Sequence, residues 1–434
     1  MSTLKKNLRT VVCLLLCLLL FPVLPASADD EIVEIDFWHH YPSGTGAEIM
    51  TQVLNEFMEA HPNIKVNELG LGLGEQGEKL IPALVAGTAP DIFVYDLATV
   101  QERGMKEQTM CLDEYVAEAG MDLGTFFPAT VDCCTYDGKL YGLPYMTDTR
   151  VLFYNKDHFR AAGLDPEKPP KSWDEVLDYV EKLNITNEEG EVTQVGFSTI
   201  WWEIAPWTMG WTFGAEYWDA DGNPTLNTPE MLEALKFVRK LCAAVGEDAY
   251  QKLFDASMAT GISPFTNGTV SMCVQFNGFC STLATYAPDM DYGVALIPTK
   301  DGENYKSSWG AGYSLEFTHK SDERAKAAFE LGKYLVSTEI ATRFLLGNSE
   351  YVCNMKAYED PQVQSDPVWQ VFAESGKYTR IHHFCPELPT WPNTILVPEW
   401  LAALSDTKTP EQALEDAQKN LVQEIDNYRM LNGN

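Results

Sequence analysis

Short apolar runs alternate with segments of helical spacing along the first quarter of the chain. Residues 32–38 form a β-rich run, and residues 49–58 place apolar side chains three and four positions apart. The order then repeats with a strand-like run at 64–69, a helical pattern at 78–86 and a strand-like run at 92–95. This alternation predicts a parallel sheet covered by helices, and therefore an α/β fold class.

Aromatic and polar residues follow two of these predicted strands. Trp38 and His39 stand at the end of the first strand, and Asp96 directly follows the third. In open α/β sheets, ligands bind beyond the carboxyl ends of the strands. Trp38, His39 and Asp96 are therefore candidate ligand-binding residues. The alternative is that His39 and His40 are ordinary loop histidines and that Asp96 caps a helix.

The N-terminus has the pattern of a cleavable secretory signal over residues 1–28. Lys5, Lys6 and Arg9 precede an apolar stretch at 11–24, which ends in the small residues 26–28. That stretch is short for a membrane span, which needs about 20 apolar residues. No cysteine follows the expected cleavage point. We therefore expect an exported, periplasmic or extracellular protein that is soluble after cleavage and has no lipid anchor.

The charge balance excludes one class of partner. The 434 residues carry a formal charge of −32, and removal of the three leader cations lowers it to −35. So acidic a chain does not clamp nucleic acid. Its length predicts two or three domains. Eight of the ten cysteines lie beyond the leader, and both disulfides and buried free thiols are compatible with an oxidising compartment.

Motifs of the common catalytic centres do not occur in the sequence. There is no Gly-x-Ser-x-Gly, His-Glu-x-x-His, Walker-type or dinucleotide-binding motif, and the glycines of 70–74 alternate as in a flexible loop. We assign no catalytic residue and expect no cofactor and no metal, although the pairs His39-His40 and His382-His383 would bind a metal if brought together. A glycoside hydrolase that uses Asp96 and Asp148 as paired carboxylates stays an alternative.

The centre of the chain carries a specific resemblance. The runs Leu143-Pro144-Tyr145, Thr147-Asp148-Thr149-Arg150 and Leu152-Phe153-Tyr154-Asn155-Lys156 resemble the segment that crosses between lobes in extracellular solute-binding proteins of bacterial ABC importers, of the maltose-binding and glycerol-3-phosphate-binding type. Further segments match in order at 37–39, 86–91, 162–166, 172–175 and 266–272, and Ile297-Pro298 resembles a second crossing. The resemblance covers almost everything from residue 31 to the end.

That resemblance implies a two-lobed fold with a hinge between two discontinuous α/β domains. Residues 31–147 and 299–345 would form the first lobe, and residues 148–298 and 346–434 the second. The ligand would lie in the cleft between the lobes and shift the protein toward a closed form, which the transmembrane permease recognises. The protein would act as a monomer.

The resemblance also implies ligand-binding residues in both lobes. Carboxylates make charge-assisted hydrogen bonds to sugar hydroxyls, and tryptophan faces cover the C–H side of a sugar ring. The implied residues are Thr147, Asp148, Trp201, Trp202, Asn277, Gly310, Gly312, Tyr351 and Trp391. Trp207 and Trp211 are further candidates, and one or two of these four second-lobe tryptophans are expected to reach ligand. The two glycines would let the backbone approach closely. Arg150 either pairs with Asp148 or touches the solute.

The C-terminal segment bears on the class of ligand. A glycerol-3-phosphate receptor of this kind is expected to present an arginine there, because guanidinium groups recognise phosphate well. Residues 385–393 contain Glu387 and no cation. A neutral sugar or oligosaccharide is therefore the expected ligand. A receptor for glycerol 3-phosphate or a glycerophosphodiester stays the alternative, because Arg380, His382 and His383 lie nearby in sequence.

Overall fold

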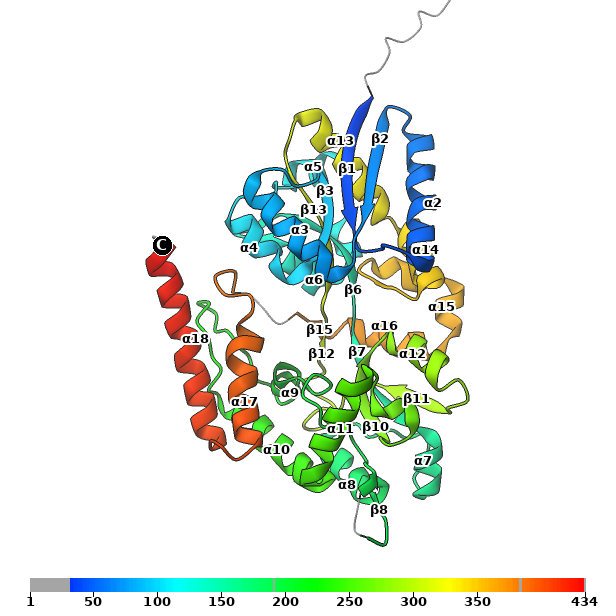
Figure 1. Cartoon of the computed structure of the whole chain (residues 1–434), viewed down its shortest axis with the longest axis vertical. Coiled ribbons are helices and arrows are strands. Elements are labelled where there is room, and N and C mark those ends of the chain that lie inside the picture. The colour runs from blue at the N-terminus through cyan, green and yellow to red at the C-terminus, as the bar shows by residue number, and fades with distance from the viewer. Residues whose placement is uncertain (1–31, 190–191, 382–384, 433–434) are drawn as a thin grey trace, which may run out of the picture.

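The computed structural model describes residues 32–189, 192–381 and 385–432 and folds them into two lobes that lie one above the other along the longest axis (Figure 1). The predicted leader, residues 1–28, and the pair His382-His383 lie outside these described residues. The N-terminal strands belong to the upper lobe, and the C-terminal helix α18 (Pro410–Asn432) runs along one side of the lower lobe. No helix within the described ranges is long and apolar enough to cross a bilayer.

A six-stranded sheet forms the centre of the first lobe. Its strand order is β14-β6-β13-β3-β1-β2, with bounds Tyr351–Val352, Gly142–Thr147, Gly312–Phe317, Ile92–Asp96, Val33–His39 and Ile64–Gly70. Strand β1 pairs in parallel with β2 and β3, as the alternating pattern predicts. Strand β13 is antiparallel to both β3 and β6, and β14 is antiparallel to β6. The sheet is therefore mixed.

The first two helices pack through the apolar positions that the sequence pattern identified. Helix α2 (Gly44–Ala60) buries Met50, Val53, Leu54 and Phe57. Helix α3 spans Leu73–Ala86, so it begins inside the glycine-rich segment that was interpreted as a flexible loop. The physical reason is a buried contact: the side-chain amide of Gln76 donates to the backbone carbonyl of Val94 and ties the first turn of α3 to β3.

Further helices complete the first lobe. They are α4 (Val100–Met105), α5 (Asp113–Glu118), α6 (Pro128–Cys133), α13 (Asp322–Leu335), α14 (Thr338–Asn348) and α15 (Pro361–Ser365). Helix α13 packs on β1 and β13, and α14 packs on α2. Beneath the sheet and helices, a buried ion pair joins α4 to β13: Arg103 Nε donates to Glu316 Oε2 at 2.6 Å. Neither side chain is more than 6% exposed.

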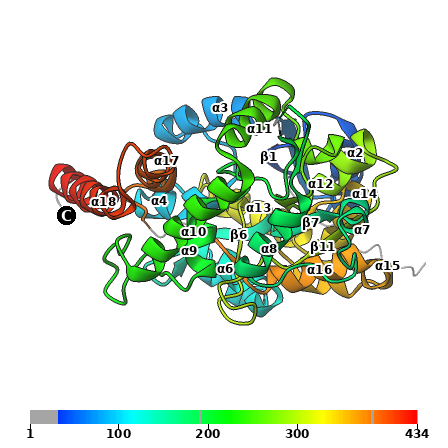
Figure 2. The same ribbon diagram turned by 90° about the horizontal axis from the view of Figure 1, so that it is seen from below.

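The second lobe has a smaller, antiparallel sheet and more helix. Strand β7 (Arg150–Asn155) lies between β10 (Met272–Phe276) and β11 (Tyr292–Ala295). Phe153 on the central strand contacts the rings of Phe265, Phe279 and Phe372 and thereby centres the core. The helices around it are α7 (Lys156–Ala161), α8 (Trp173–Leu183), α9 (Pro206–Thr212), α10 (Pro229–Val245), α11 (Glu247–Thr260), α12 (Phe279–Tyr286), α16 (Pro367–Gly376), α17 (Val397–Leu404) and α18. Figure 2 shows the same lobe from below, with α17 and α18 side by side.

The chain passes between the lobes along neighbouring strands. One crossing joins β6 to β7, and another joins β12 (Ser308–Trp309) to β13. Strand β15 (Thr379–Arg380) pairs in parallel with β12. The Thr149 hydroxyl lies within hydrogen-bond distance of the Ser308, Ser375 and Thr379 hydroxyls, at 2.9, 2.9 and 2.6 Å. The crossing segments are thus held together by a buried cluster of hydroxyl groups.

The predicted lobe boundaries differ from the observed pairings at two places. Thr299, expected in the first lobe, donates its N–H to the Lys171 carbonyl and accepts from the Trp173 N–H in the second lobe. Strand β14, expected in the second lobe, pairs with β6 of the first-lobe sheet. The crossing expected at Ile297-Pro298 therefore lies later, between β12 and β13. A boundary inside a loop leaves no local signal, because it is set by pairing with distant strands.

Candidate functional site

The polar ends of β1 and β3 take different roles. His39 is buried (2% exposed), accepts from the Tyr41 N–H at 3.3 Å and lies 3.4 Å from Glu68. Burial lowers the pKa of His39, so the ring is neutral at pH 7. Trp38 is half-buried and packs against the small cluster of Leu80, Ala89 and Phe93 near α3. The buried His39 side chain therefore contacts residues of the sheet and of the loop that follows β1. This corrects its prediction as a ligand-binding residue.

Asp96 stays open to solvent at the end of β3. Its carboxylate accepts from the Ala98 N–H at 2.9 Å and so caps the short 3₁₀ turn at Leu97–Thr99. Loss of hydration within the junction raises the pKa of Asp96, and the hydrogen bond from Ala98 and the nearby Arg103 lower it in part. The side chain is nevertheless exposed. The capping alternative is thus correct, and the same carboxylate still faces solvent where a ligand can reach it.

One aromatic neighbour of Asp96 carries no signal in the sequence. Tyr313, the register partner of Asp96 in the sheet, is half-buried. The ring of His40 stacks on it, with centroids 4.5 Å apart and planes at 21°. Burial lowers the pKa of His40 to about 3, so its ring is uncharged. The signal that placed His39 at the strand end applied equally to His40, but nothing local showed that Tyr313 would be its partner.

A compact group occupies the crossing between β6 and β7. Asp148 Oδ1 accepts from the Ala311 N–H at 2.9 Å and from Arg150 Nη1 at 2.8 Å. The guanidinium carbon of Arg150 lies 3.5 Å from the ring centroid of Trp309, and Nη1 also donates to the Trp309 carbonyl. Thr147 donates to the Ala311 carbonyl at 2.8 Å. Arg150 therefore pairs with Asp148, the first of its two predicted roles, and Thr147 holds the crossing together.

The second-lobe tryptophans divide into two pairs. Trp201 and Trp202 are half-exposed, with ring centroids 5.7 Å apart in an edge-to-face arrangement. Trp207 and Trp211 are buried, and Trp207 packs edge-to-face against Trp309 with centroids 4.9 Å apart. The first pair keeps the larger exposed surface, although Trp211 lines a separate pocket together with Pro128 and Asp132 of the first lobe.

Glu203 follows the two half-exposed tryptophans in the same loop. It is buried and accepts from the side-chain amide of Gln275 on β10 at 2.7 Å. Burial raises the pKa of Glu203. The contact fixes the loop at 198–205 to the end of β10.

Asn277, just after β10, reaches the first lobe. Its amide nitrogen lies 3.5 Å from the carbonyl oxygen of Ser349, which follows α14, and its Oδ1 is buried without a hydrogen-bond partner. The end of β10 therefore marks the side of the second lobe that faces the first. Asn277 thus contacts the first lobe through Ser349, and its predicted contact with ligand stays a prediction.

Two predicted aromatic ligand contacts are core residues instead. Tyr351 is fully buried, stacks on Phe127 and donates its hydroxyl to the Phe372 carbonyl at 2.8 Å. Trp391 is fully buried between Tyr217 and Trp218, at 6.0 Å from each ring. Both side chains are enclosed by residues distant in sequence, so these predictions are corrected.

Close packing at the hinge requires glycine at positions 310 and 312. A Cβ at Gly310 would lie 2.5 Å from Thr379 Cγ2 and 2.7 Å from the Asp148 carbonyl oxygen. A Cβ at Gly312 would lie 2.2 Å from the Met146 carbonyl oxygen. The backbone approaches other protein atoms closely at both positions, and its expected approach to a ligand stays a prediction.

The described residues contain no group of three or more His, Cys, Asp or Glu side chains placed to hold a metal ion. Cys134, Cys273, Cys353 and Cys385 are buried free thiols, whereas Cys111 is an exposed one. The four buried thiols fit the interpretation of cysteine as a small apolar residue.

Known proteins similar in sequence come from two kinds of importer. The sn-glycerol-3-phosphate-binding periplasmic protein UgpB of Escherichia coli K12 is 29% identical over 283 residues, which are 62% of this chain and 61% of that protein. The chain thus spans less than two thirds of the length of this relative. A probable amino-acid ABC transporter periplasmic-binding protein of Sinorhizobium fredii is 26% identical over 408 residues, 87% of this chain and 86% of that one.

Solved structures of similar fold cover more of the chain. The protein CpMnBP1 with mannotriose bound is 26% identical, with a TM-score of 0.73 over 91% of this chain and all of that one. The cyclic α-maltosyl-1,6-maltose binding protein of Arthrobacter globiformis has a TM-score of 0.76 at 19% identity over 91% of this chain and all of that one, which is a likeness of fold. These structures share the two-lobed architecture described above.

The family model described as "Bacterial extracellular solute-binding protein" matches residues 41–342. This range includes most of the first-lobe sheet, the whole second-lobe sheet and two crossings between the lobes. The chain belongs to the family of bacterial extracellular solute-binding proteins.

Proposed function

We propose that this protein is the receptor of an ABC importer and binds a neutral sugar or oligosaccharide in the cleft between its lobes. The observation that carries the proposal is the combination of carboxylates and aromatic rings at the junction. Asp96 on the first lobe and Asp148 at the crossing supply carboxylates, while Trp201 and Trp202 on the second lobe supply half-exposed aromatic rings. Hydroxyl-binding groups and ring-covering faces are the two requirements of a sugar site.

Each of these residues has a distinct role in the proposal. Asp96 and Asp148 accept hydrogen bonds from sugar hydroxyls, and the Asp148 side chain keeps 23% of its surface exposed beside Arg150. Trp201 and Trp202 cover one face of a ring, and Tyr313 extends the contact on the first lobe. Trp38 and Asn277 stay candidates at the edge of the site.

Capture depends on the hinge. A ligand that contacts both lobes favours the closed arrangement, because only then are both sets of contacts made. The hydroxyl cluster around Thr149 links the crossing segments, so the lobes turn about a defined axis. The closed form is what the permease recognises. We propose that the protein is exported, acts as a monomer and catalyses no reaction.

The charges around Asp96 and Asp148 argue against a phosphorylated solute at that position. Arg150 is the only cation in the set Asp96, Thr147, Asp148, Arg150, Trp201, Trp202, Trp309 and Tyr313, and it is already paired with Asp148. In the C-terminal segment Glu387 pairs with Arg429, with Oε1 and Nη2 2.9 Å apart. A phosphate would therefore meet the solvent-exposed carboxylate of Asp96, which costs binding energy.

Names of the similar proteins support both candidate ligands. CpMnBP1 was solved with mannotriose and with mannobiose, and a Thermotoga maritima protein was solved with maltose. The glycerol-3-phosphate-binding relatives keep the phosphorylated ligand as a second candidate. The sugar is preferred because Arg150, the one cation in the set of residues given above, is already paired with Asp148.

A thermal-shift screen of the protein without residues 1–28 separates the candidates. Ligand at 100 times its dissociation constant adds about 2.7 kcal/mol to the free energy of unfolding. We expect stabilisation by mannobiose, mannotriose, maltose or maltotriose, no stabilisation by sn-glycerol 3-phosphate or divalent metals, and recovery of the sugar unchanged. Stabilisation by glycerol phosphate alone, or recovery of a cleaved sugar, would replace the proposal.

The site assignment is tested separately by Asp148→Asn. Loss of a charge-assisted hydrogen bond lowers affinity for the sugar by about 1.5–3 kcal/mol, or roughly 10- to 100-fold. The exposed Asp289 on the second lobe provides the matched control, and Asp289→Asn should leave affinity unchanged. Equal affinity of the two variants in titration calorimetry would remove Asp148 from the site.

A further inference from the structure

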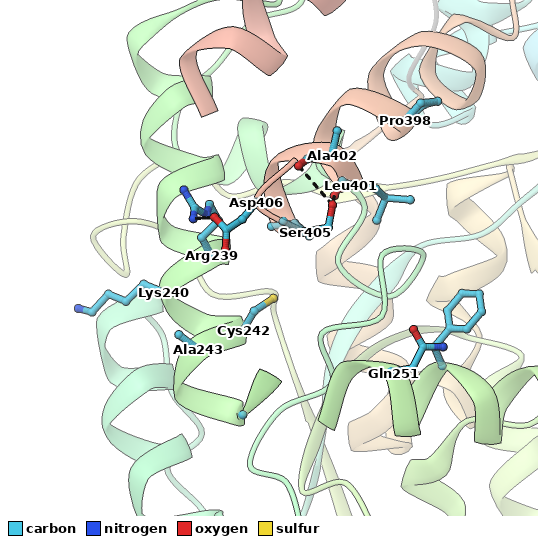
Figure 3. Close-up of a pocket in the computed structure, with 13 residues that line it drawn as sticks. Arg239, Lys240, Cys242, Ala243, Gln251, Pro398, Leu401, Ala402, Ser405 and Asp406 are labelled. Atoms are coloured by element: carbon cyan, nitrogen blue, oxygen red, sulfur yellow. Dashed lines mark hydrogen bonds and ion pairs between the residues drawn. The ribbon is translucent and has the colours of Figure 1, made fainter. Parts of the chain in front are cut away.

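The second lobe contains a pocket of about 1010 Å³ between α10, α11 and α17 (Figure 3). Phe254 and Leu401 provide apolar wall, and Lys240, Gln251 and Ser405 provide polar groups around it. In Figure 3 Gln251 lies on one side of the pocket, Lys240 on the opposite side, and α17 closes the third. Ligand sites in proteins have volumes of about 300–1,000 Å³, so this pocket is large enough for more than one sugar unit.

An aromatic series connects this pocket to the lobe junction. The ring centroid of Trp202 lies 5.7 Å from that of Trp201 and 5.4 Å from that of Phe254. Trp201 and Trp202 are half-exposed on the loop at 198–205, whereas Phe254 lines the pocket. Neighbouring aromatic rings, in edge-to-face and tilted contact, therefore connect the proposed sugar site to the pocket.

Contacts of the loop at 198–205 place it at the side of the second lobe that faces the first. Ser198 donates its N–H to the Met272 carbonyl at 2.8 Å, and Glu203 accepts from Gln275. Two residues after Gln275, Asn277 contacts Ser349 of the first lobe. The aromatic series thus begins at the junction and continues away from it along the second lobe.

The groups that line the pocket suit a neutral, hydroxylated ligand. Arg239 and Asp406 form an ion pair with each other, which leaves Lys240 as the one further charged side chain among the lining residues. The Ser405 hydroxyl donates to the Leu401 carbonyl at 2.9 Å and keeps lone pairs that can accept from a ligand. Gln251 offers both a donor and an acceptor.

We infer that this pocket holds the distal units of an oligosaccharide whose first unit is bound at the lobe junction. The inference rests on the proposed function and specifies its substrate class as a chain of sugar units. Trp202 covers the unit at the boundary, Phe254 covers the next, and Gln251 and Ser405 bind hydroxyls. A monosaccharide fills the junction alone and gains nothing from the pocket.

Calorimetric titration of the mature protein with mannose, mannobiose and mannotriose, and with glucose, maltose and maltotriose, tests the inference. Within the series that binds, we expect affinity to rise at least tenfold from the shortest to the longest ligand. Phe254→Ala should abolish this rise and change affinity for the shortest ligand less than about twofold. Tyr286→Ala, which removes an exposed aromatic ring from α12 of the same lobe, is the matched control and should keep the rise.

A second readout does not depend on a variant that folds. Cys242 lines the pocket and is half-buried, whereas Cys111 is exposed on the first lobe. Alkylation by iodoacetamide, followed residue by residue with mass spectrometry, should slow at Cys242 when the trisaccharide is bound. The rate at Cys111 should not change, and the monosaccharide should protect neither thiol.

The outcomes distinguish this inference from the proposed function. If no sugar binds, the proposed function fails and the inference fails with it. If sugars bind with affinities independent of length, or if the trisaccharide leaves the alkylation of Cys242 unchanged, the inference alone is overturned. Length-dependent affinity that survives Phe254→Ala would place the distal units elsewhere and also overturn it.

Discussion

The two lobes build their sides of the junction in different ways. On the first lobe, Asp96 and Tyr313 are adjacent positions of one six-stranded sheet, and their places are fixed by backbone hydrogen bonds. On the second lobe, Trp201 and Trp202 stand on a loop between a short strand segment and α9, and are held by side-chain packing. The first lobe thus holds its residues in a hydrogen-bonded sheet, which we call the frame. The second lobe presents aromatic rings from a loop.

This difference predicts where substitutions act. Changes beneath the first-lobe sheet should affect stability, because the frame and the fold depend on the same contacts. Changes to the exposed second-lobe rings should affect binding and leave stability nearly intact. Buried rings of the second lobe form a third class and should behave like the frame.

Glu316→Gln should have the largest effect. It removes the negative partner of Arg103, whose side chain is 6% exposed, and leaves a buried charge without compensation. Breaking such a pair lowers the free energy of unfolding by about 3–5 kcal/mol, measured by urea denaturation. The control is Glu102→Gln in the solvent-facing pair with Lys106, which should cost at most about 1 kcal/mol. Equal losses in the two variants would contradict the distinction.

Trp391→Ala and Trp201→Ala should separate the buried and exposed rings of the second lobe. Trp391 is fully buried, and its truncation should lower the free energy of unfolding by about 3–5 kcal/mol without changing sugar affinity. Trp201 is half-exposed, and its truncation should weaken sugar binding with little loss of stability. Thermal unfolding and calorimetry of both variants check this pair. A loss of affinity confined to Trp391→Ala would restore that residue to the site.

The pH dependence of the free energy of unfolding should come from the first lobe. Because the pKa of His40 falls from 6.5 to about 3 in the folded protein, the unfolded chain binds the proton more readily. Stability is therefore complete above about pH 6.5 and falls as the pH drops toward 3, by up to about 1.4 kcal/mol per pH unit. His40→Phe should flatten this slope in melting curves, while the buried His39 leaves a remainder. An unchanged slope would show that His40 does not titrate in this way.

Asn277→Ala should give the smallest effect. Its contact with Ser349 is long, at 3.5 Å, and its own Oδ1 is buried without a partner, so removal loses little and relieves one unsatisfied group. We expect a change below about 1 kcal/mol in the free energy of unfolding. A larger loss would mean that this contact holds the lobes together, and would move Asn277 from the edge of the site to its hinge.

The sequence predicts the frame better than the ring surface. The alternation through residue 95 identifies β1, β2 and β3, and the end of a predicted strand locates Asp96. Both the spacing of apolar residues and the turn residues between elements are local signals. The motif at 147–150 likewise locates Asp148, and it leaves the pair with Arg150 as one of two roles for that arginine. These features need no knowledge of distant neighbours.

Aromatic residues carry no such local signal. Trp391 and Trp201 look alike in sequence, but Tyr217 and Trp218 enclose the first and leave the second open. Tyr351 is enclosed by Phe127 and Phe372 in the same way. Trp309 was missed because its position under Arg150 depends on the crossing strands. Burial of a ring is decided by tertiary contacts that spacing does not encode.

Small-angle X-ray scattering with and without ligand tests the central claim most directly. We take the mature protein and the sugar that gives the largest thermal shift. If the sugar binds between the lobes and favours their closed arrangement, the radius of gyration falls at saturation and stays unchanged with sn-glycerol 3-phosphate. A radius of gyration that does not change, although calorimetry shows the sugar bound, would contradict capture between the lobes.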